Sequence, residues 1–333
     1  MPTLRRLLSR LRDLLHRLIV LLLPLVPKAI VGRVASRYIA GETLDDAVRV
    51  VRELNQRGFA GTIDVLGEDV TAPEQADAAV ATYLEVLDRI HAEGLRTGVS
   101  LKLTQLGLRL DQDRCLGNLM RIVHAAAERG IFVRVDMEDS SLTDRTLRIV
   151  EAARRESPKV GAVLQAYLHR TPDDAERLIA EGCTIRLCKG IYREPPEIAW
   201  QDRQKVRDVF VGVARRFLQS EVYIGLATHD IALLETLRAE IRTQGVPNDR
   251  YEFQALLGVP ITATLDQLVA EGHRVRLYVP FGSHWYPYSV RRLKENPQMA
   301  GHVLSALFRR DRGLLRPHEP ATTEPASDSP TRW

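Results

Sequence analysis

Between residues 59 and 279, short apolar runs alternate with longer segments of helical periodicity. Eight such runs occur, each followed by a segment predicted to be helical, and the fifth helix is expected over 195–219. Eight β/α units in about 240 residues indicate a closed (β/α)8 barrel of the TIM type. An open doubly wound sheet is the alternative, but no G-x-G-x-x-G sequence follows the first run and no Walker A sequence occurs. The runs are 61–67, 99–103, 131–137, 160–168, 183–189, 222–228, 251–256 and 274–279.

The segments that flank this pattern differ from it in composition. Residues 1–58 are predicted to form an N-terminal helical arm, residues 59–310 the barrel, and residues 311–333, rich in Pro, Ser, Thr and Glu, a disordered tail. Within the arm, the uninterrupted apolar run 18–23 is far shorter than the ~20 residues that span a bilayer. Arginines interleaved with leucines fit an amphipathic helix on anionic lipid, and they also fit a helix docked on the protein itself or on a sister subunit.

The net charge of +4 is concentrated in the arm. Residues 1–37 hold seven Arg and one Lys against one acid, so the rest of the chain is net negative. This distribution argues against a nucleic-acid partner. Three cysteines, Cys115, Cys183 and Cys188, indicate a reducing compartment and core packing. No His, Cys and Asp cluster has the spacing of a zinc site, so no metal is predicted.

Polar residues stand at the carboxyl end of nearly every predicted strand after the first. In a (β/α)8 barrel these ends meet at the face that carries the active site. Any one of them could be an ordinary surface charge, but their convergence favours a site for an anionic cofactor and an anionic substrate. Gly190 would let a ligand approach the backbone, and Thr228 and His229 could donate to a pyrophosphate. The residues are Lys102, Asp136, Gln165, Arg186, Lys189, Gly190, Thr228, His229, Glu252, Gln254 and Tyr278.

The stretch YVPFGSHWYPYSVRRLKENP, residues 278–297, adds two adjacent arginines. On a helix, Arg291 and Arg292 point about 100° apart, so both can flank one ligand. Two forked guanidinium groups can hold a carboxylate, and Tyr278 and Tyr288 could enclose a small apolar ring. The alternative is a solvated helix face in which Glu295 only pairs with Arg291.

Seven blocks of this sequence, in this order, resemble the proline dehydrogenase family in its small monofunctional bacterial form. The resemblance implies a distorted barrel that binds FAD non-covalently, oxidises L-proline to Δ1-pyrroline-5-carboxylate and passes electrons to a membrane quinone. A cytoplasmic protein is expected, and the arginine and leucine pattern of the arm, which is not part of the family's shared core, predicts peripheral contact with the inner face of the cytoplasmic membrane. The blocks are SLKLTQLGL (100–108), VRVDMEDS (133–140), VLQAYLHRT (163–171), IRLCKGIYREP (185–195), ATHD (227–230), YEFQALLGV (251–259) and the stretch 278–297.

The same resemblance implies roles for individual residues. Arg291, Arg292 and Lys102 would hold the substrate carboxylate, and Tyr278, Tyr288 and Leu256 would pack on its ring. Asp136 would order the cationic cluster, and Arg186 and Gln165 would contact the isoalloxazine. Glu295 would brace the arginine pair beside the cofactor. The remaining FAD-lining residues would be Met137, Lys189, Gly190, Ile191, Thr228 and His229. The family commonly has alanine in place of Ile191, which leaves the details of that loop open.

Two other classes of protein remain open at this point. A barrel flavoenzyme that reduces a folate with a nicotinamide donor would share fold and cofactor, but its large substrate would not need two adjacent arginines walled by tyrosines. A membrane-associated binding protein without catalysis would keep the arm and lack the flavin. Reduction by proline, and not by NADH, separates the first from the predicted enzyme.

Overall fold

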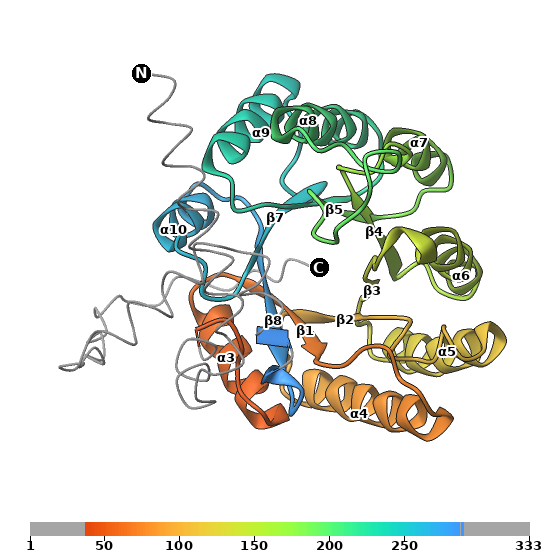
Figure 1. The fold of residues 1–333 in the computed structure, drawn as a ribbon. Coiled ribbons are helices and arrows are strands. Elements are labelled where there is room, and N and C mark those ends of the chain that lie inside the picture. The colour runs from red at the N-terminus through yellow and green to blue at the C-terminus, as the bar shows by residue number, and fades with distance from the viewer. Residues whose placement is uncertain (1–36, 287, 290–333) are drawn as a thin grey trace, which may run out of the picture.

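In a computed structural model, which describes residues 37–286, 288 and 289, eight parallel strands form a closed barrel (Figure 1). The strands pair in chain order, and β8 closes the barrel against β1, from Ala60 opposite Arg276 to Val65 opposite Phe281. The predicted TIM-type fold is therefore confirmed. The strands are β1 (Ala60–Val65), β2 (Thr97–Leu101), β3 (Val133–Val135), β4 (Val160–Gln165), β5 (Ile185–Cys188), β6 (Ile224–Ala227), β7 (Tyr251–Leu256) and β8 (Val275–Phe281).

Helices surround the barrel, one after each of β1 to β7 (Figure 1). An additional helix, α3 (Leu44–Gln56), precedes β1 and packs against β1 and β8, between α10 and α4. A short 3-10 turn, η2 (Ser140–Leu142), leads into α6. The other helices are α4 (Pro73–Ala92), α5 (Gln112–Glu128), α6 (Thr143–Glu156), α7 (Thr171–Ala180), α8 (Arg203–Gln219), α9 (Ile231–Gln244) and α10 (Thr262–Ala270).

Local sequence explains where several helices begin. Thr43 caps α3 in a reciprocal capping box with Asp46, and the side chain of Asp111 caps α5. The helix predicted over 195–219 begins only at Arg203, because the Asp202 side chain accepts a hydrogen bond from the backbone N–H of Lys205. Residues 189–202 form a loop, and Ala199 in this loop forms an isolated antiparallel β-bridge with Leu168, in the segment after β4. The prediction of helix over 195–202 was therefore wrong.

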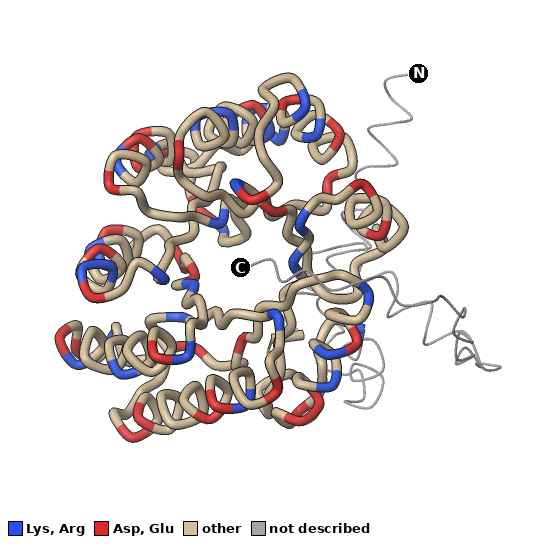
Figure 2. Tube along the Cα trace, turned by 180° about the vertical axis from the view of Figure 1, so that it is seen from behind, with Lys and Arg blue, Asp and Glu red and all other residues tan. Residues whose placement is uncertain are grey.

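Alternation along the strands separates an apolar layer from a polar barrel interior. Val133 and Val135 are buried towards the helices, whereas Arg134 and Asp136 share the opposite side of β3. The main hydrophobic core therefore lies between the strands and the helices. Charged side chains fill much of the barrel itself, and in Figure 2 Lys and Arg positions border its centre beside Asp and Glu positions.

Some predicted features lie outside the described residues. These are the arm up to residue 36 and the tail at 311–333, so the proposed division into arm, barrel and tail stays a prediction. Within the described part of the chain, no helix combines the length and apolar character needed to cross a membrane.

Candidate active site

A cavity of about 380 Å³ opens where the carboxyl ends of the strands meet. It is lined by the predicted site residues that the structure describes, except Glu252, and these come from seven strands, β2 to β8, and from Tyr288. Glu252 was wrongly predicted for this face: it is the second residue of β7, near the amino end of the strand, and lines a separate cavity at the other end of the barrel. Three further predicted residues, Arg291, Arg292 and Glu295, lie outside the described residues. The predicted residues in the lining are Lys102, Asp136, Met137, Gln165, Arg186, Lys189, Gly190, Ile191, Thr228, His229, Gln254, Leu256, Tyr278 and Tyr288.

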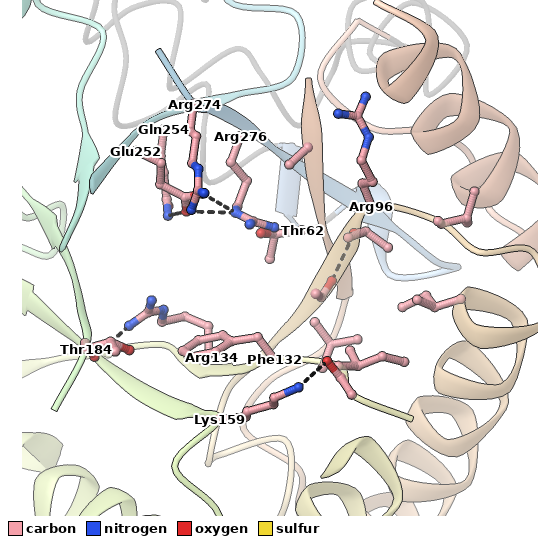
Figure 3. Close-up of a pocket in the computed structure, with 18 of the residues that line it drawn as sticks. Thr62, Arg96, Phe132, Arg134, Lys159, Thr184, Glu252, Gln254, Arg274 and Arg276 are labelled. Atoms are coloured by element: carbon pink, nitrogen blue, oxygen red, sulfur yellow. Dashed lines mark hydrogen bonds and ion pairs between the residues drawn. The ribbon is translucent and has the colours of Figure 1, made fainter. Parts of the chain in front are cut away.

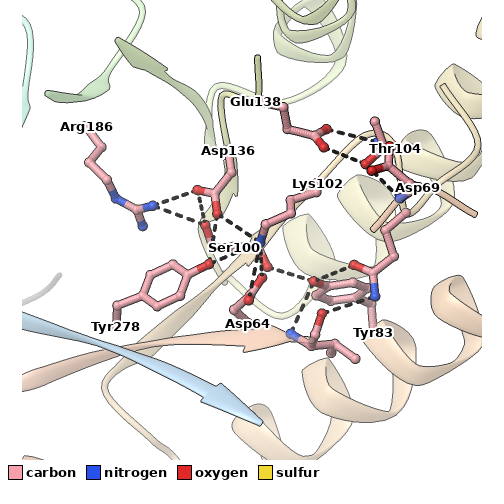
Figure 4. Close-up of polar contacts among 12 residues, drawn as sticks. Asp64, Asp69, Tyr83, Ser100, Lys102, Thr104, Asp136, Glu138, Arg186 and Tyr278 are labelled. Carbon is pink, nitrogen blue, oxygen red and sulfur yellow. Dashed lines mark hydrogen bonds and ion pairs between the residues drawn. The ribbon is translucent and has the colours of Figure 1, made fainter. Parts of the chain in front are cut away.

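Asp136 is the centre of a buried charged cluster at the floor of this cavity (Figure 4). Its Oδ1 accepts a hydrogen bond from Arg186 Nη1 at 2.6 Å, and its Oδ2 accepts one from the Tyr278 hydroxyl at 2.9 Å. Lys102 Nζ lies 3.6 Å from the same Oδ2. A single carboxylate thus fixes two cations and one phenol, which are the groups that face the cavity.

A second carboxylate, Asp64 near the end of β1, belongs to the same buried cluster and pairs with Lys102. Asp64 is fully buried, and its Oδ1 lies 3.2 Å from Lys102 Nζ. Ser100 donates to Asp136 Oδ1 at 2.6 Å, and the Tyr83 hydroxyl donates to the Ser100 carbonyl at 2.8 Å (Figure 4). Two acids therefore lie against the two bases before any ligand is bound, although burial, opposed by Lys102, raises the pKa of Asp64.

The cluster sets the protonation state of its members. Burial lowers the pKa of Lys102, but the Asp64 and Asp136 carboxylates outweigh it, so the pKa is raised and the ammonium stays charged. Burial raises the pKa of Asp136, yet Arg186 and Lys102 bring it below the ordinary value overall. For Tyr278, burial and the two carboxylates all raise the pKa, so the phenol keeps its proton. The cluster therefore holds a charged ammonium, compensated by its carboxylate neighbours, and a protonated phenol that donates to Asp136.

Residues on α4 and β1 were missing from the predicted site. Asp64 shares the inward side of β1 with Thr62, so strand alternation could have found it. Tyr83 sits in the middle of α4, distant in the sequence from every strand end, and no signal in the sequence connects it to Ser100. Ser100 stands at the inward position before Lys102 and could have been found by the same alternation.

Arg186 is held from its other side by β7. Its Nε donates to Gln254 Oε1 at 2.7 Å, and its guanidinium lies 5.2 Å from the centre of the Tyr278 ring. Gln254 in turn donates to Glu252 Oε1 at 2.5 Å. These contacts leave little freedom to Arg186, which is buried below the cavity.

Gln165, at the end of β4, has an unsatisfied polar atom. Its side chain is buried in the lining of the cavity, and its Oε1 has no hydrogen-bond partner within the described part of the chain. An orphaned buried oxygen costs free energy unless a ligand supplies a donor. This position therefore fits a cofactor with a polar ring edge.

The loop after β5 and the start of α9 border the outer part of the cavity. Lys189 Nζ bonds Asp230 Oδ2 at 2.5 Å, and Arg207 Nε bonds the same oxygen at 2.6 Å. Although burial opposes it, hydrogen bonds from Lys189 and then Arg207 lower the pKa of Asp230 to about 2. His229 Nε2 accepts from the Leu256 backbone N–H at 3.0 Å, which ties this loop to the end of β7.

Gly190 has a φ of +106°, and a Cβ there would collide with the Tyr167 ring, so the turn requires glycine. The neighbouring Ile191 is 40% exposed although it lines the cavity. An apolar side chain in this position leaves a hydrophobic surface at the mouth of the site.

The apolar wall of the cavity comes from separate elements. Tyr288 is buried with Ile39 and Leu66, against Trp285. Leu256 ends β7 and Met137 follows β3, so both stand beside the charged cluster. The cavity thus joins an apolar wall to a buried charged floor, as small-molecule sites do.

A closed (β/α)8 barrel with this cluster at the carboxyl ends of its strands is the architecture of a barrel enzyme. The family profile described as proline dehydrogenase matches residues 47–304. The chain therefore belongs to the proline dehydrogenase family, a family of oxidoreductases, as the resemblance in its sequence predicted.

Individual relatives agree with the family assignment. The chain is 33% identical to proline dehydrogenase 1 of Bacillus subtilis (strain 168) over 83% of its own length and 91% of that protein. It is 34% identical to proline dehydrogenase of Deinococcus radiodurans over 83% of its length and 90% of that protein. Among solved structures, proline utilization A (PutA) from Bdellovibrio bacteriovorus, inactivated by N-propargylglycine, matches with a TM-score of 0.75 at 23% identity. This match covers 80% of the chain but 33% of the solved chain, and it supports the fold.

Proposed function

We propose that the protein oxidises L-proline to Δ1-pyrroline-5-carboxylate, with FAD bound in the cavity at the carboxyl ends of the strands and a membrane quinone as electron acceptor. The observation that carries the proposal is the cluster of Lys102, Asp136, Arg186 and Tyr278 at the floor of that cavity, in a chain of the proline dehydrogenase family. This cluster combines a fixed cation for a carboxylate with an aromatic wall for a small ring.

Substrate binding would begin with the carboxylate of proline. Lys102 stays charged, because its two carboxylate neighbours raise its pKa, so it can attract an anionic group. Asp64 and Asp136 already compensate this charge, so Lys102 alone would bind a carboxylate weakly. Arg291 and Arg292 would supply the additional positive charge, which explains why the sequence places two arginines together there.

The ring of proline would then pack between Tyr278, Tyr288 and Leu256. With the carboxylate fixed at one end and the ring enclosed, the carbon next to the nitrogen is held in one orientation. Such orientation can lower an activation free energy by several kcal/mol. The substrate amine must be neutral when it reacts, so that its lone pair can assist the loss of hydride.

The residues around the cavity fit FAD. Bound FAD would supply the two-electron acceptor for the hydride of that ring carbon. The unsatisfied Gln165 Oε1 would accept a hydrogen bond from the isoalloxazine edge. Arg186, held by Asp136 and Gln254, would place a fixed positive charge beside the flavin and favour its anionic reduced form.

The rest of the cofactor would lie along the outer lining of the cavity. Lys189, Gly190, Thr228 and His229 would border the pyrophosphate, with Met137 and Ile191 against apolar parts of the cofactor. Glu295 would brace the arginine pair. Because Lys189 is engaged by Asp230, this ion pair would have to loosen or share its ammonium with a phosphate.

We also infer a cytoplasmic location with peripheral contact to the inner face of the membrane, where a quinone would be reached. The support is the arm, in which arginines alternate with leucines. No nucleic-acid or metal partner is proposed.

The experiment is a visible absorption spectrum of the purified, FAD-reconstituted protein. We expect a flavin band that proline bleaches under anaerobic conditions and that NADH leaves unchanged. A folded protein that takes up no flavin, or whose flavin is reduced by NADH and not by proline, would contradict the proposal.

A further inference from the structure

A second cavity, of about 690 Å³, lies at the opposite end of the barrel (Figure 3). Its lining includes Ala60 and Thr97, the first residues of β1 and β2, and Thr184, which directly precedes β5. Arg186 and Gln254 line both cavities, so their hydrogen bond separates the two ends of the barrel interior. The lower cavity plays no part in the proposed proline chemistry.

The lining of this lower cavity is strongly basic. Seven of its residues are Lys or Arg and two are Asp or Glu. Glu252, the buried one of these two acids, already has partners within the lining. Its carboxylate accepts a hydrogen bond from Arg276 Nε at 2.7 Å and another from the Gln254 amide. The positive charge of the cavity is therefore not balanced by its own lining.

Arg134 is the cation that most needs a counterion. Its side chain is 5% exposed, and Nη1 donates to the carbonyls of Ala162 at 2.8 Å and Thr184 at 2.9 Å. Among the described residues, no carboxylate lies within 4.0 Å of its guanidinium, and Nε and Nη2 have no acceptor. The guanidinium also lies 4.7 Å from the centre of the Phe132 ring.

The hydroxyl beside this arginine is unsatisfied as well. Thr184 Oγ1 is buried in the same lining and has no hydrogen-bond partner in the described part of the chain. Gly161 leaves the space for both groups, since a Cβ there would lie 2.5 Å from Arg134 Nη1 and from Thr184 Oγ1. Burial, reinforced by the Arg186 guanidinium and opposed by the more distant Glu252 carboxylate, lowers the pKa of Arg134 to about 9, so the group is still charged at neutral pH.

A purely structural role would have Arg134 only tie β3 to β4 and β5 through the two carbonyls. Carbonyl dipoles satisfy hydrogen bonds but do not neutralise a buried charge, and an unpaired buried cation is costly. An anion in the cavity would remove that cost, accept from the free side of the guanidinium and use the Thr184 hydroxyl.

We propose that the lower cavity binds one small anion, a phosphate group or a carboxylate, through the guanidinium of Arg134 and the hydroxyl of Thr184. Arg276 and Lys159, from β8 and the segment before β4, border the same space (Figure 3) and add long-range attraction. A phosphate group and a carboxylate would be recognised in the same way, because each offers anionic oxygens that accept hydrogen bonds from the forked N–H groups of a guanidinium.

The test is calorimetric titration of the full-length protein with inorganic phosphate and, separately, with succinate, each against sodium chloride at equal ionic strength. We expect saturable binding of phosphate, succinate or both at a site that substitutions of Thr184 and Arg134 weaken, and none of chloride. Thr184→Val should weaken binding several-fold, and Arg134→Met should weaken it roughly tenfold to a hundredfold. Arg155→Met is the matched control, because Arg155 is exposed and, among residues 37–286, 288 and 289 that the structure describes, forms its ion pair only with Glu151 on its own helix.

The relative affinities assign the source of the anion. Tighter phosphate binding indicates a phosphorylated ligand, and tighter succinate binding indicates a carboxylate. No binding of either anion, equal heats with chloride, or binding that both Thr184→Val and Arg134→Met leave unchanged would overturn the proposal. If Arg134→Met fails to fold, Thr184→Val decides. The measurement does not involve proline turnover, so it succeeds or fails independently of the proposed oxidation.

Discussion

Replacing Asp136 by asparagine removes the charge at the centre of the buried cluster and keeps its shape. Asp136 lies 2.6 Å from Arg186 Nη1 and 3.6 Å from Lys102 Nζ. At an effective dielectric constant near 20, Coulomb's law gives about 6 and about 5 kcal/mol of attraction at these distances. Much of this is offset because Asp136 no longer has to leave water, so we expect the free energy of unfolding to fall by about 3–5 kcal/mol.

The matched control is Asp88→Asn on α4. Asp88 Oδ1 accepts from Arg129 Nη2 at the same 2.6 Å, but the Asp88 side chain is 62% exposed. Solvent screens such a pair, and we expect a loss below about 1 kcal/mol. Urea denaturation at pH 7, followed by circular dichroism, measures both variants.

The pH dependence gives a second check on the Asp136→Asn variant. The pKa of Asp136 is lowered in the folded protein, so its charge stabilises the fold above the ordinary Asp value, about 3.9, and this contribution is lost as the pH falls through the folded pKa. The difference between wild type and Asp136→Asn should be constant from pH 7 to 5 and shrink below about pH 4. A loss no larger than that of Asp88→Asn, or a difference that is unaffected by acid, would refute the reasoning.

Four further predictions concern the proposed activity. Lys102→Met should raise the KM for proline at least tenfold, measured by steady-state kinetics, and leave flavin content near one per chain; an unchanged KM would remove Lys102 from the substrate site. Gln254→Leu should leave Arg186 without its Nε acceptor and slow anaerobic flavin reduction by proline roughly tenfold, as one lost hydrogen bond to a charged group does; an unaltered reduction rate would contradict this. Arg292→Ala should weaken proline binding by about 30-fold to several thousand-fold but pyrrolidine binding little, since the carboxylate contact is already missing there; equal losses would show that Arg292 only supports its helix. Deleting residues 1–30 should reduce co-sedimentation with anionic liposomes and preserve proline oxidation with a soluble acceptor, and loss of both would make the arm structural.

The periodicity of the sequence was enough to predict the barrel and its active face. Eight alternating strand and helix segments have few compact arrangements, and parallel strands in a barrel present their carboxyl ends together. Lys102, Asp136 and Arg186 could therefore be assigned to one cavity before any contact was known, and the structure places them there.

Contacts between elements that are distant in the chain required the tertiary structure. Tyr83 reaches Ser100 from a helix, a contact that no short motif encodes. Alternation places Asp64 on the inward side of β1, but only the closed barrel brings it within 3.2 Å of Lys102 Nζ. The start of α8 at Arg203 was also missed. The β-bridge between Leu168 and Ala199 keeps the preceding residues in a loop conformation, where the sequence had predicted a helix.

The order of strands and helices follows from local periodicity, and with it the residue types at the strand ends, so both could be predicted before any contact was known. Which buried charges have a compensating partner depends on the folded barrel. Asp136 has two cationic neighbours at one end of the barrel, whereas Arg134, two residues earlier on the same side of β3, has carbonyl partners and no carboxylate within ion-pair distance among the described residues. That difference arises from the closing of eight strands around a common interior, where the partners of each side chain come from strands far away in the sequence.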